Sequence, residues 1–291
     1  MTRVIVDRNA GFCGGVRRAI RGTEELLSAR SQEADRPRRI LSYGQLVHNR
    51  EVTDDLAAQG LEKLKSLEDA AREDAVVLRT HGISPQEEQL IRSRGADIHD
   101  LTCPRVKKLH RQIQEKRDTG YRIIIVGDAE HPEVRASLGH AGEKGMVVTS
   151  AAEVRRVPTG EKIAVFAQTT ITPQSFQEVV ALLESRGQEM IVVDSLCPFV
   201  LKRQRWIEKY SKLADACLIL GGRNSSNTRK LHSLAAANGP AFHLSTAQEL
   251  DVREILRYPV VALTAGASTS DHTIEAVLTR LQAAGALIEQ R

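Results

Sequence analysis

The chain has 291 residues, of which 41% are hydrophobic and 27% charged, as in a globular protein with more than one core. Its formal net charge is +4, and only 3% of its residues are aromatic. Because nucleic-acid binding needs a basic stripe or a set of stacking aromatic residues, this composition disfavours a nucleic-acid partner. A mild positive charge suits an anionic small substrate or an acidic protein partner.

Short β-branched runs alternate with amphipathic stretches along the chain. The runs predict strands at residues 3–7, 40–44, 75–79, 122–127, 145–149, 162–167, 190–194, 216–220 and 260–264. The amphipathic stretches predict helices at residues 16–29, 85–94, 106–116, 173–185, 200–213, 228–237 and 272–284. This alternation is typical of α/β proteins with mostly parallel sheets, which is the fold class we expect. Residues 31–39 predict a solvated loop.

Three cysteines share one local pattern and lie roughly 90 residues apart. Cys13, Cys103 and Cys197 each follow an extended stretch and open a basic amphipathic helix. Pro104 and Pro198 fit the first helical position, where a missing N–H costs nothing. Because a helix N-terminus stabilises a thiolate, the three cysteines are candidate metal ligands.

The repeated junction predicts three pseudo-equivalent α/β units that each offer one cysteine to a shared centre. We expect their boundaries at residues 13–102, 103–196 and 197–291, with the last unit completed by the N-terminal strand within residues 1–12. Three thiolates at one centre would bind a soft metal centre and leave one coordination position open.

Other interpretations of the cysteines are less favoured. The sequence has neither an N-terminal apolar signal stretch nor an apolar run long enough to span a membrane, which predicts a cytoplasmic, reducing location without disulfides. Structural zinc sites usually show closely paired cysteines, so an iron–sulfur cluster is the better match. A zinc hydrolase with three thiolate ligands and a set of buried structural cysteines are the alternatives. Cys217 lies in an apolar strand, and we expect it in the core.

Polar clusters follow several of the predicted strands, at the edge where α/β sheets gather ligands. They contain His48, His81 and His131, which we interpret as anion ligands because the cysteines already supply the metal site. Two runs of small residues, 224–227 and 264–270, lead from strand to helix, where hydroxyl and backbone N–H groups can face a phosphate. Simple N-capping is the alternative for the first run. Because the chain has no P-loop motif and no Gly-x-Gly-x-x-Gly, the clusters predict a diphosphate pocket of another kind.

Glu133 is a carboxylate in one of these clusters. It is either a first-turn acid that complements a helix dipole or a proton donor beside a redox centre. Thr169 and Thr170 are candidates to hold a substrate hydroxyl or to relay that proton. We expect His110, seven residues after Cys103, to be structural.

Together these motifs resemble the LytB family of 4-hydroxy-3-methylbut-2-enyl diphosphate reductases. The resemblance runs from about residue 4 to residue 271. The residues that carry it are 11–16, 47–49, 80–84, 102–104, 131–134, 168–170, 224–227 and 264–268. Among them, Gly-Phe-Cys-Gly-Gly-Val, Thr-Cys-Pro and His-Pro-Glu-Val are the most specific strings.

The resemblance implies a trefoil of three α/β domains around a central [4Fe–4S] cluster, held by the cysteines at positions 13, 103 and 197. The open fourth iron would take the substrate's hydroxyl oxygen. The residues that match the family's diphosphate ligands are His48, His81, His131, Ser225, Ser226, Asn227 and Ser268. Glu133 matches the proton-delivering glutamate, with His131 beside it, and Thr169 matches the threonine that positions the substrate hydroxyl.

The implied reaction converts (E)-4-hydroxy-3-methylbut-2-enyl diphosphate to isopentenyl and dimethylallyl diphosphates. It is a two-electron reductive dehydroxylation, the last step of the non-mevalonate isoprenoid pathway. The implied electron donor is ferredoxin or flavodoxin, and neither nucleic acid nor a membrane is implied.

Two positions depart from the family's pattern. Val200 stands where the family has a threonine after the third cysteine, and Ala136 stands where it has a glycine. These departures leave a same-fold reductase or dehydratase with another substrate as an alternative. A non-enzymatic iron–sulfur scaffold or redox sensor is a second alternative, but it has no use for the histidine and serine clusters.

Overall fold

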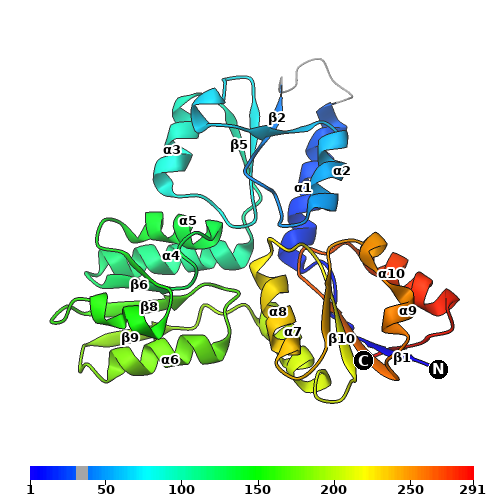
Figure 1. Cartoon of the computed structure of the whole chain (residues 1–291). Helices are drawn as coiled ribbons and strands as arrows, with labels where there is room; N and C mark the ends of the chain where they lie inside the picture. Colours follow the sequence, from blue (N-terminus) through cyan, green and yellow to red (C-terminus); the bar gives the residue numbers. More distant parts are fainter. Residues whose placement is uncertain (31–38) are drawn as a thin grey trace. The chain divides into compact units, whose positions relative to one another are not determined.

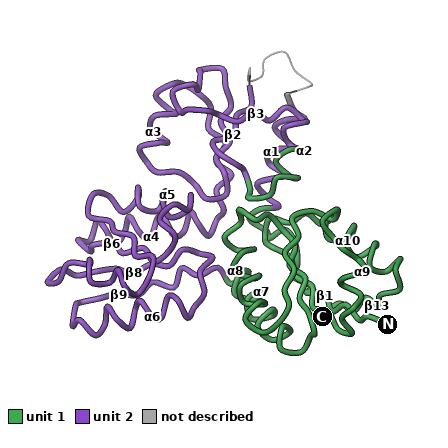
Figure 2. Tube along the Cα trace, in the orientation of Figure 1, with its two compact units in different colours: residues 1–16, 47–54, 198–291 green, residues 17–46, 55–197 purple. Residues whose placement is uncertain are grey.

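The structure is a computed structural model that describes residues 1–30 and 39–291. All but residue 39 of the predicted loop at 31–39 therefore lies outside the described residues. The chain divides into two compact units (Figure 2). Unit 1 comprises Met1–Val16, Val47–Asp54 and Pro198–Arg291, and unit 2 comprises Arg17–Leu46 and Asp55–Cys197.

Three parallel sheets flanked by helices make up the fold, which confirms the α/β class (Figure 1). The sheet of unit 1 has the order β11-β10-β12-β1-β13. Its strands are β1 (Arg3–Val6), β10 (Ala216–Leu220), β11 (Ala241–Leu244), β12 (Val260–Ala265) and β13 (Leu287–Gln290). The N-terminal strand β1 thus lies between two strands from the C-terminal part of the chain, and all pairings are parallel.

Both faces of this sheet are covered, as a parallel sheet requires. On β1, Val4 and Val6 join one core, while Ile5 joins the other. The helices that contribute to these two cores are α7 (Pro198–Tyr210) and α8 (Ser226–Ala236) on the Ile5 side, and α9 (Val252–Ile255) and α10 (Asp271–Ala283) on the other.

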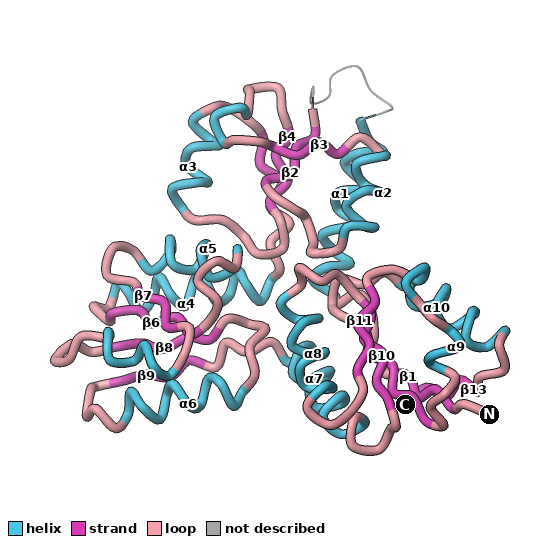
Figure 3. The backbone as a smooth tube through the Cα atoms, viewed as in Figure 1, coloured by secondary structure: helices cyan, strands magenta, loops and turns pink. Residues whose placement is uncertain are grey.

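Unit 2 holds the other two sheets, whose strands are drawn in magenta in Figure 3. The first has the order β3-β2-β4-β5, with β2 (Ile40–Tyr43), β3 (Leu61–Leu64), β4 (Ala75–Leu78) and β5 (Asp97–Asp100). The helix α3 (Pro85–Ser93) packs on it through Ile91. The helices α1 (Gly14–Arg30) and α2 (Arg50–Ala58) begin in segments of unit 1 and continue into unit 2.

The second sheet of unit 2 has the order β7-β6-β8-β9, with β6 (Arg122–Val126), β7 (Met146–Val148), β8 (Ile163–Ala167) and β9 (Met190–Val193). The helix α6 (Pro173–Glu184) packs on one face through Phe176 and Leu183. The helices α4 (Pro104–Asp118) and α5 (Pro132–Ala141) pack on the other face, where Ile113 meets the β-strand residue Ile123.

All nine predicted strands and all seven predicted helices are present, but the structure contains further elements. The strands that the sequence analysis missed are β3, β5, β11 and β13, and the missed helices are α2, α5 and the short α9. Each missed strand lies at the edge of its sheet. An edge strand has one neighbour and can carry charged side chains, so its sequence lacks the apolar run that marks a central strand. Within residues 1–30 and 39–291, we find no helix that is both long and apolar enough to cross a membrane.

Candidate functional site

The three cysteine junctions have the predicted local structure. The helices α1, α4 and α7 begin at the residue that follows Cys13, Cys103 and Cys197, respectively. All three thiols are half-buried, whereas Cys217 lies in β10 and is only 2% exposed. Burial raises the pKa of Cys217 to about 11, which keeps it a neutral core thiol. The expectation of a core position for Cys217 is confirmed.

Each junction cysteine is tied to a loop that carries other candidate residues. The backbone N–H of Cys13 donates to the carbonyl of Ala267 at 3.1 Å, within the small-residue run after β12. The N–H of Cys103 donates to Thr80, which precedes His81, at 3.0 Å. These bonds hold the start of each helix against the end of a neighbouring strand, the edge where the sequence analysis expects ligands.

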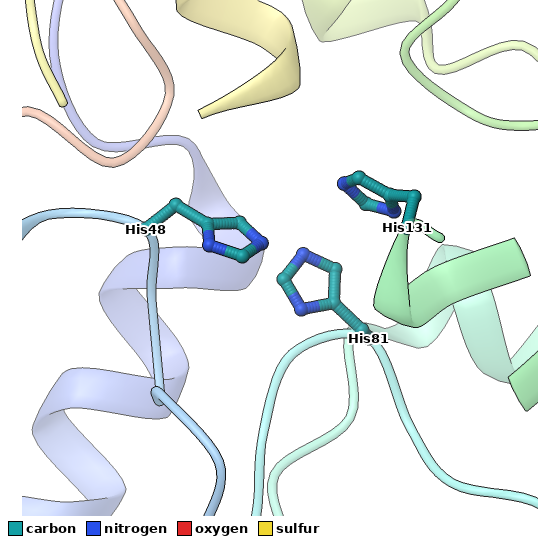
Figure 4. A group of neighbouring side chains, drawn as sticks. All are labelled: His48, His81 and His131. Atoms are coloured by element: carbon teal, nitrogen blue, oxygen red, sulfur yellow. The ribbon is translucent and has the colours of Figure 1, made fainter. Parts of the chain in front are cut away.

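In unit 2, His81 and His131 approach each other directly. His81 lies in the loop after β4, and His131 is the N-cap of α5. Their ring centroids are 5.2 Å apart at an interplanar angle of 89°, and Figure 4 shows the two rings edge to face. The Nδ1 of His131 accepts the backbone N–H of Glu133 at 3.2 Å. In its neutral form, His131 therefore carries its hydrogen on Nε2 and can donate it to an anion.

Glu133 is buried, with 2% of its surface exposed, and both of its carboxyl oxygens are bound by Thr169. The Thr169 backbone N–H donates to Oε1 at 2.7 Å, and the Thr169 hydroxyl donates to Oε2 at 2.6 Å. Burial is the largest influence on Glu133 and raises its pKa, although both bonds from Thr169 lower it. A first-turn acid that only complements a helix dipole would face solvent, so this geometry favours the interpretation as a proton donor.

The Thr169 segment also reaches the third cysteine. The N–H of Cys197 donates to the carbonyl of Thr169 at 3.0 Å. The neighbouring Gln168 is 1% exposed; its Oε1 accepts the N–H of Asp128 at 3.0 Å and its Nε2 donates to the Thr170 hydroxyl at 3.0 Å. These two hydrogen bonds fix the side chain of Gln168. The neighbouring Thr169 is thereby held between the carboxyl group of Glu133 and Cys197, the residue before α7.

In unit 1, the candidate residues come from loops at the ends of the central strands. Ser268, after β12, donates from its hydroxyl to the carbonyl of His48 at 3.3 Å. The Nδ2 of Asn49 donates to the carbonyl of Ser268 at 2.9 Å. A side chain at Gly222, after β10, would come within 2.4 Å of the His48 carbonyl oxygen. The three loops are therefore closely packed, and a glycine is required where two of them meet.

The Asn-Ser-Ser-Asn run forms the entrance to α8. Ser225 is the N-cap and accepts the N–H of Thr228 at 3.3 Å, so the simple capping interpretation is correct for its oxygen. Its hydroxyl hydrogen remains available to a ligand. Asn227 is 5% exposed, and within the described part of the chain neither atom of its amide has a hydrogen-bond partner. A buried amide without partners is costly, so Asn227 fits a position that a ligand completes.

Comparison with known proteins identifies the family. The family model described as "LytB protein" matches residues 4–282. The chain belongs to the LytB family. A 4-hydroxy-3-methylbut-2-enyl diphosphate reductase of Caldanaerobacter subterraneus subsp. tengcongensis is 32% identical over 282 residues, which cover 96% of each chain.

Two solved structures are also similar. The E-1-hydroxy-2-methyl-but-2-enyl-4-diphosphate reductase from Plasmodium falciparum aligns with a TM-score of 0.91 at 26% identity, over 100% of this chain and 92% of that one. A structure of (E)-4-hydroxy-3-methyl-but-2-enyl diphosphate reductase, named the terminal enzyme of the non-mevalonate pathway, aligns with a TM-score of 0.71 at 32% identity, over 97% of this chain and 100% of that one. Both alignments cover nearly the whole of this chain, so the chain has the fold of these reductases.

Arg203 is a site-supporting residue of this LytB chain to which the sequence analysis gave no role. It lies on α7 and is 3% exposed. Its Nε donates to the carbonyl of Asn9 at 2.7 Å, and an Nη donates to the carbonyl of Gly11 at 2.6 Å. Because Gly11 lies two residues before Cys13, the guanidinium fixes the loop of the first cysteine against α7. The sequence places Arg203 and Gln204 six and seven residues after Cys197, and this Arg-Gln pair is the signal that could have indicated the role.

The two departures from the family pattern are both buried. Val200 lies in the first turn of α7 and is 4% exposed, and Ala136 lies on α5 and is 3% exposed. Ala136 follows Glu133 by three residues on the same helix and adds one methyl group where the family has a glycine. Val200 lies three residues after Cys197 and, unlike threonine, has no hydroxyl group.

Proposed function

We propose that this chain is a 4-hydroxy-3-methylbut-2-enyl diphosphate reductase that forms isopentenyl and dimethylallyl diphosphates. The observation that carries the proposal is the buried Glu133–Thr169 pair, whose threonine carbonyl also binds the N–H of Cys197. It joins a carboxylic acid, a hydroxyl group and a candidate iron ligand in one hydrogen-bonded unit. The relatives that bear the reductase name match nearly the whole chain, which supports the same assignment.

The cofactor in this proposal is a [4Fe–4S] cluster bound by Cys13, Cys103 and Cys197. Three half-buried thiols at helix N-termini fit such a cluster, because the positive end of a helix stabilises each thiolate. When bound, a cluster with one open iron would relay the two electrons of the reduction from the external donor, one at a time, and would supply a Lewis-acid position. Cys217 is buried in β10 and is not proposed as a ligand.

The substrate would be bound by Thr169 at its hydroxyl group and, at its diphosphate, by His48, His81, His131, Ser225, Ser226, Asn227 and Ser268. His131 supports this role because its Nδ1 accepts the N–H of Glu133, which places the ring hydrogen of the neutral imidazole on Nε2. Asn227 supports it because its buried amide lacks partners among the described residues. Hydrogen bonds to a charged group contribute about 1.5–3 kcal/mol each, so a few such contacts are sufficient for specific binding.

Glu133 would deliver the protons. Removal of a hydroxyl group as water, with replacement by hydrogen, consumes two electrons and two protons. Burial raises the pKa of Glu133 above its ordinary value of 4.5, which favours the protonated acid. A protonated Glu133 can reverse its bond to the Thr169 hydroxyl and donate through it to the substrate oxygen. Thr169 would then both orient the substrate and relay the proton.

The wider assignments follow from the same proposal. We propose three domains at 13–102, 103–196 and 197–291, the last completed by β1, because each then contains one sheet. The electron donor would be a ferredoxin or flavodoxin, in a cytoplasm that keeps the thiols reduced.

The test is anaerobic purification followed by a reductase assay with (E)-4-hydroxy-3-methylbut-2-enyl diphosphate and a chemical reductant. We expect a brown protein that contains close to four irons per chain and forms both product diphosphates. An iron-loaded protein that reduces another allylic compound but not this diphosphate would favour the same-fold paralogue. A colourless protein with one bound zinc would contradict the proposal.

A further inference from the structure

A buried and a half-buried histidine outside the proposed catalytic and substrate-binding sets stack on each other in unit 2. His110 lies on α4 and His140 on α5, with ring centroids 4.1 Å apart and an interplanar angle of 24°. Burial lowers the pKa of His110 to about 3, with a further decrease from His140, and burial also lowers the pKa of His140. Both rings are therefore neutral at neutral pH, and each has one N–H to donate.

The position of the His140 hydrogen follows from its neighbour. The Nε2 of His140 lies 3.1 Å from the carbonyl oxygen of Ile83. Because a carbonyl group can only accept, Nε2 carries the hydrogen and Nδ1 is bare. Among the described residues, this buried Nδ1 has no hydrogen-bond partner. Burial of Nδ1 without a partner lowers the stability of the fold. A histidine at this position nevertheless forms a directional hydrogen bond to Ile83 through Nε2.

Ile83 belongs to the loop that carries His81. The N–H of Gly82 donates to the carbonyl of Arg79 at 3.0 Å, which closes a turn around His81. Gly82 has a φ of +70°, and a Cβ atom there would lie 2.8 Å from Cε1 of His110. His110 thus packs directly under the turn, while His140 holds the carbonyl group that follows it.

The helix α5, which carries His140, also carries two of the proposed catalytic residues at its N-terminus. His131 is the N-cap of α5, and Glu133 lies in its first turn. The His81 loop and α5 are therefore joined at two points, the ring contact between His81 and His131 and the bond from His140 to Ile83. A side chain at Gly139 would come within 2.3 Å of Ser84, so the two segments are also in close contact between these points.

We propose that His140 is a positioning residue, which holds the His81 loop against α5 and so sets the distance between His81 and His131 that the diphosphate requires. The proposal rests on the proposed function, because it assigns a purpose to the geometry of two proposed diphosphate ligands. His140 itself touches neither the substrate nor the cluster. The effect expected from its loss is weaker binding of the diphosphate, with the chemical step retained.

The test compares two replacements of similar length in the iron-loaded protein. His140→Gln keeps an N–H donor near the position of Nε2, whereas His140→Met fills the space without a donor. Inorganic pyrophosphate is the probe for binding, measured by titration calorimetry under anaerobic conditions. We expect His140→Met to raise the pyrophosphate Kd and the substrate KM roughly three- to tenfold, with kcat within about twofold and iron content unchanged. His140→Gln should restore most of the affinity.

His232 provides a matched control. It lies on α8 in unit 1, its Nε2 is 3.2 Å from the carbonyl of Ala241, and its ring is 5.5 Å from that of His243. His232→Met removes the same kind of bond, but its partner carbonyl group lies on β11, a strand that carries no proposed ligand. It should lower the melting temperature about as much as His140→Met and leave the pyrophosphate Kd unchanged.

The outcomes separate the two proposals. An active wild-type protein with the same pyrophosphate Kd in His140→Met overturns the role of His140 and leaves the reductase assignment intact. Equal weakening by His140→Met and His140→Gln also overturns it, since the donor would then not matter. A wild-type protein that binds pyrophosphate but does not convert the allylic diphosphate overturns the reductase assignment, while the comparison of variants still decides the role of His140.

Discussion

Replacement of Glu133 by glutamine tests the proton donor directly. Glu133 accepts the N–H and the hydroxyl of Thr169 at 2.7 and 2.6 Å. The glutamine amide can still accept the N–H with its oxygen and can donate to the Thr169 hydroxyl, so the shape and both contacts persist. Only the acidic proton is lost. Since general acid catalysis contributes about 10²–10⁴-fold, we expect turnover to fall by that factor.

The assay for Glu133→Gln is steady-state reduction of the allylic diphosphate by a chemical reductant under anaerobic conditions. Iron content and pyrophosphate affinity should stay within about twofold of wild type, because the fold and both hydrogen bonds are kept. Near wild-type turnover in Glu133→Gln would refute the assignment. The proton would then have to come from another source, with a water molecule held by the substrate's own diphosphate as the next candidate.

The same substitution has a consequence for stability. Burial raises the folded-state pKa of Glu133 above its ordinary value of 4.5, so the native protein binds more protons than the unfolded chain above that pH. The contribution of the protonated acid is full below about pH 4.5 and is lost as the pH rises through the folded-state pKa. Glutamine does not titrate. The melting temperature of Glu133→Gln relative to wild type should therefore increase as the pH rises from about 4.5 through the folded-state pKa, and a pH-independent difference would contradict the raised pKa.

Three further predictions concern the cysteines, the amide of Asn227 and the arginine under the first cysteine. Cys103→Ser should lose iron and activity, whereas Cys217→Ser should keep the chromophore with only a packing cost; the reverse pattern in iron analysis would show that the ligand assignment is wrong. Asn227→Ala should raise the pyrophosphate Kd about 10- to 150-fold without bleaching the cluster, and unchanged affinity in calorimetry would remove Asn227 from the pocket. Arg203→Met leaves the carbonyl groups of Asn9 and Gly11 without its two donors, so thermal or denaturant unfolding should show a loss of about 1–3 kcal/mol together with lower iron retention; normal iron content would argue against its support of the Cys13 loop.

Every central strand could be predicted from the sequence, whereas four edge strands, β3, β5, β11 and β13, could not. The central strand β10 reads Ala-Cys-Leu-Ile-Leu and is buried at every position. The edge strand β5 reads Asp-Ile-His-Asp and has no buried residue, although it pairs in parallel with β4. A central parallel strand is covered on both faces and flanked on both sides, so its sequence must be apolar. An edge strand forms because its backbone hydrogen-bonds to the strand beside it. Its own side chains need not be apolar, so its sequence gives little sign of that pairing.

For the candidate site, the sequence by itself determined the local chemistry. It placed Cys103 and Cys197 at helix starts and Glu133 beside His131, because proline, glycine and capping residues fix such junctions within a few positions. Only the tertiary structure decided the partners of these groups. Glu133 meets Thr169 from 36 residues away, His140 meets Ile83 from 57 residues away, and Arg203 meets Gly11 from 192 residues away. These distant bonds depend on how parallel strands are ordered and packed, and that order is set by burial summed over whole sheets, which no local pattern records.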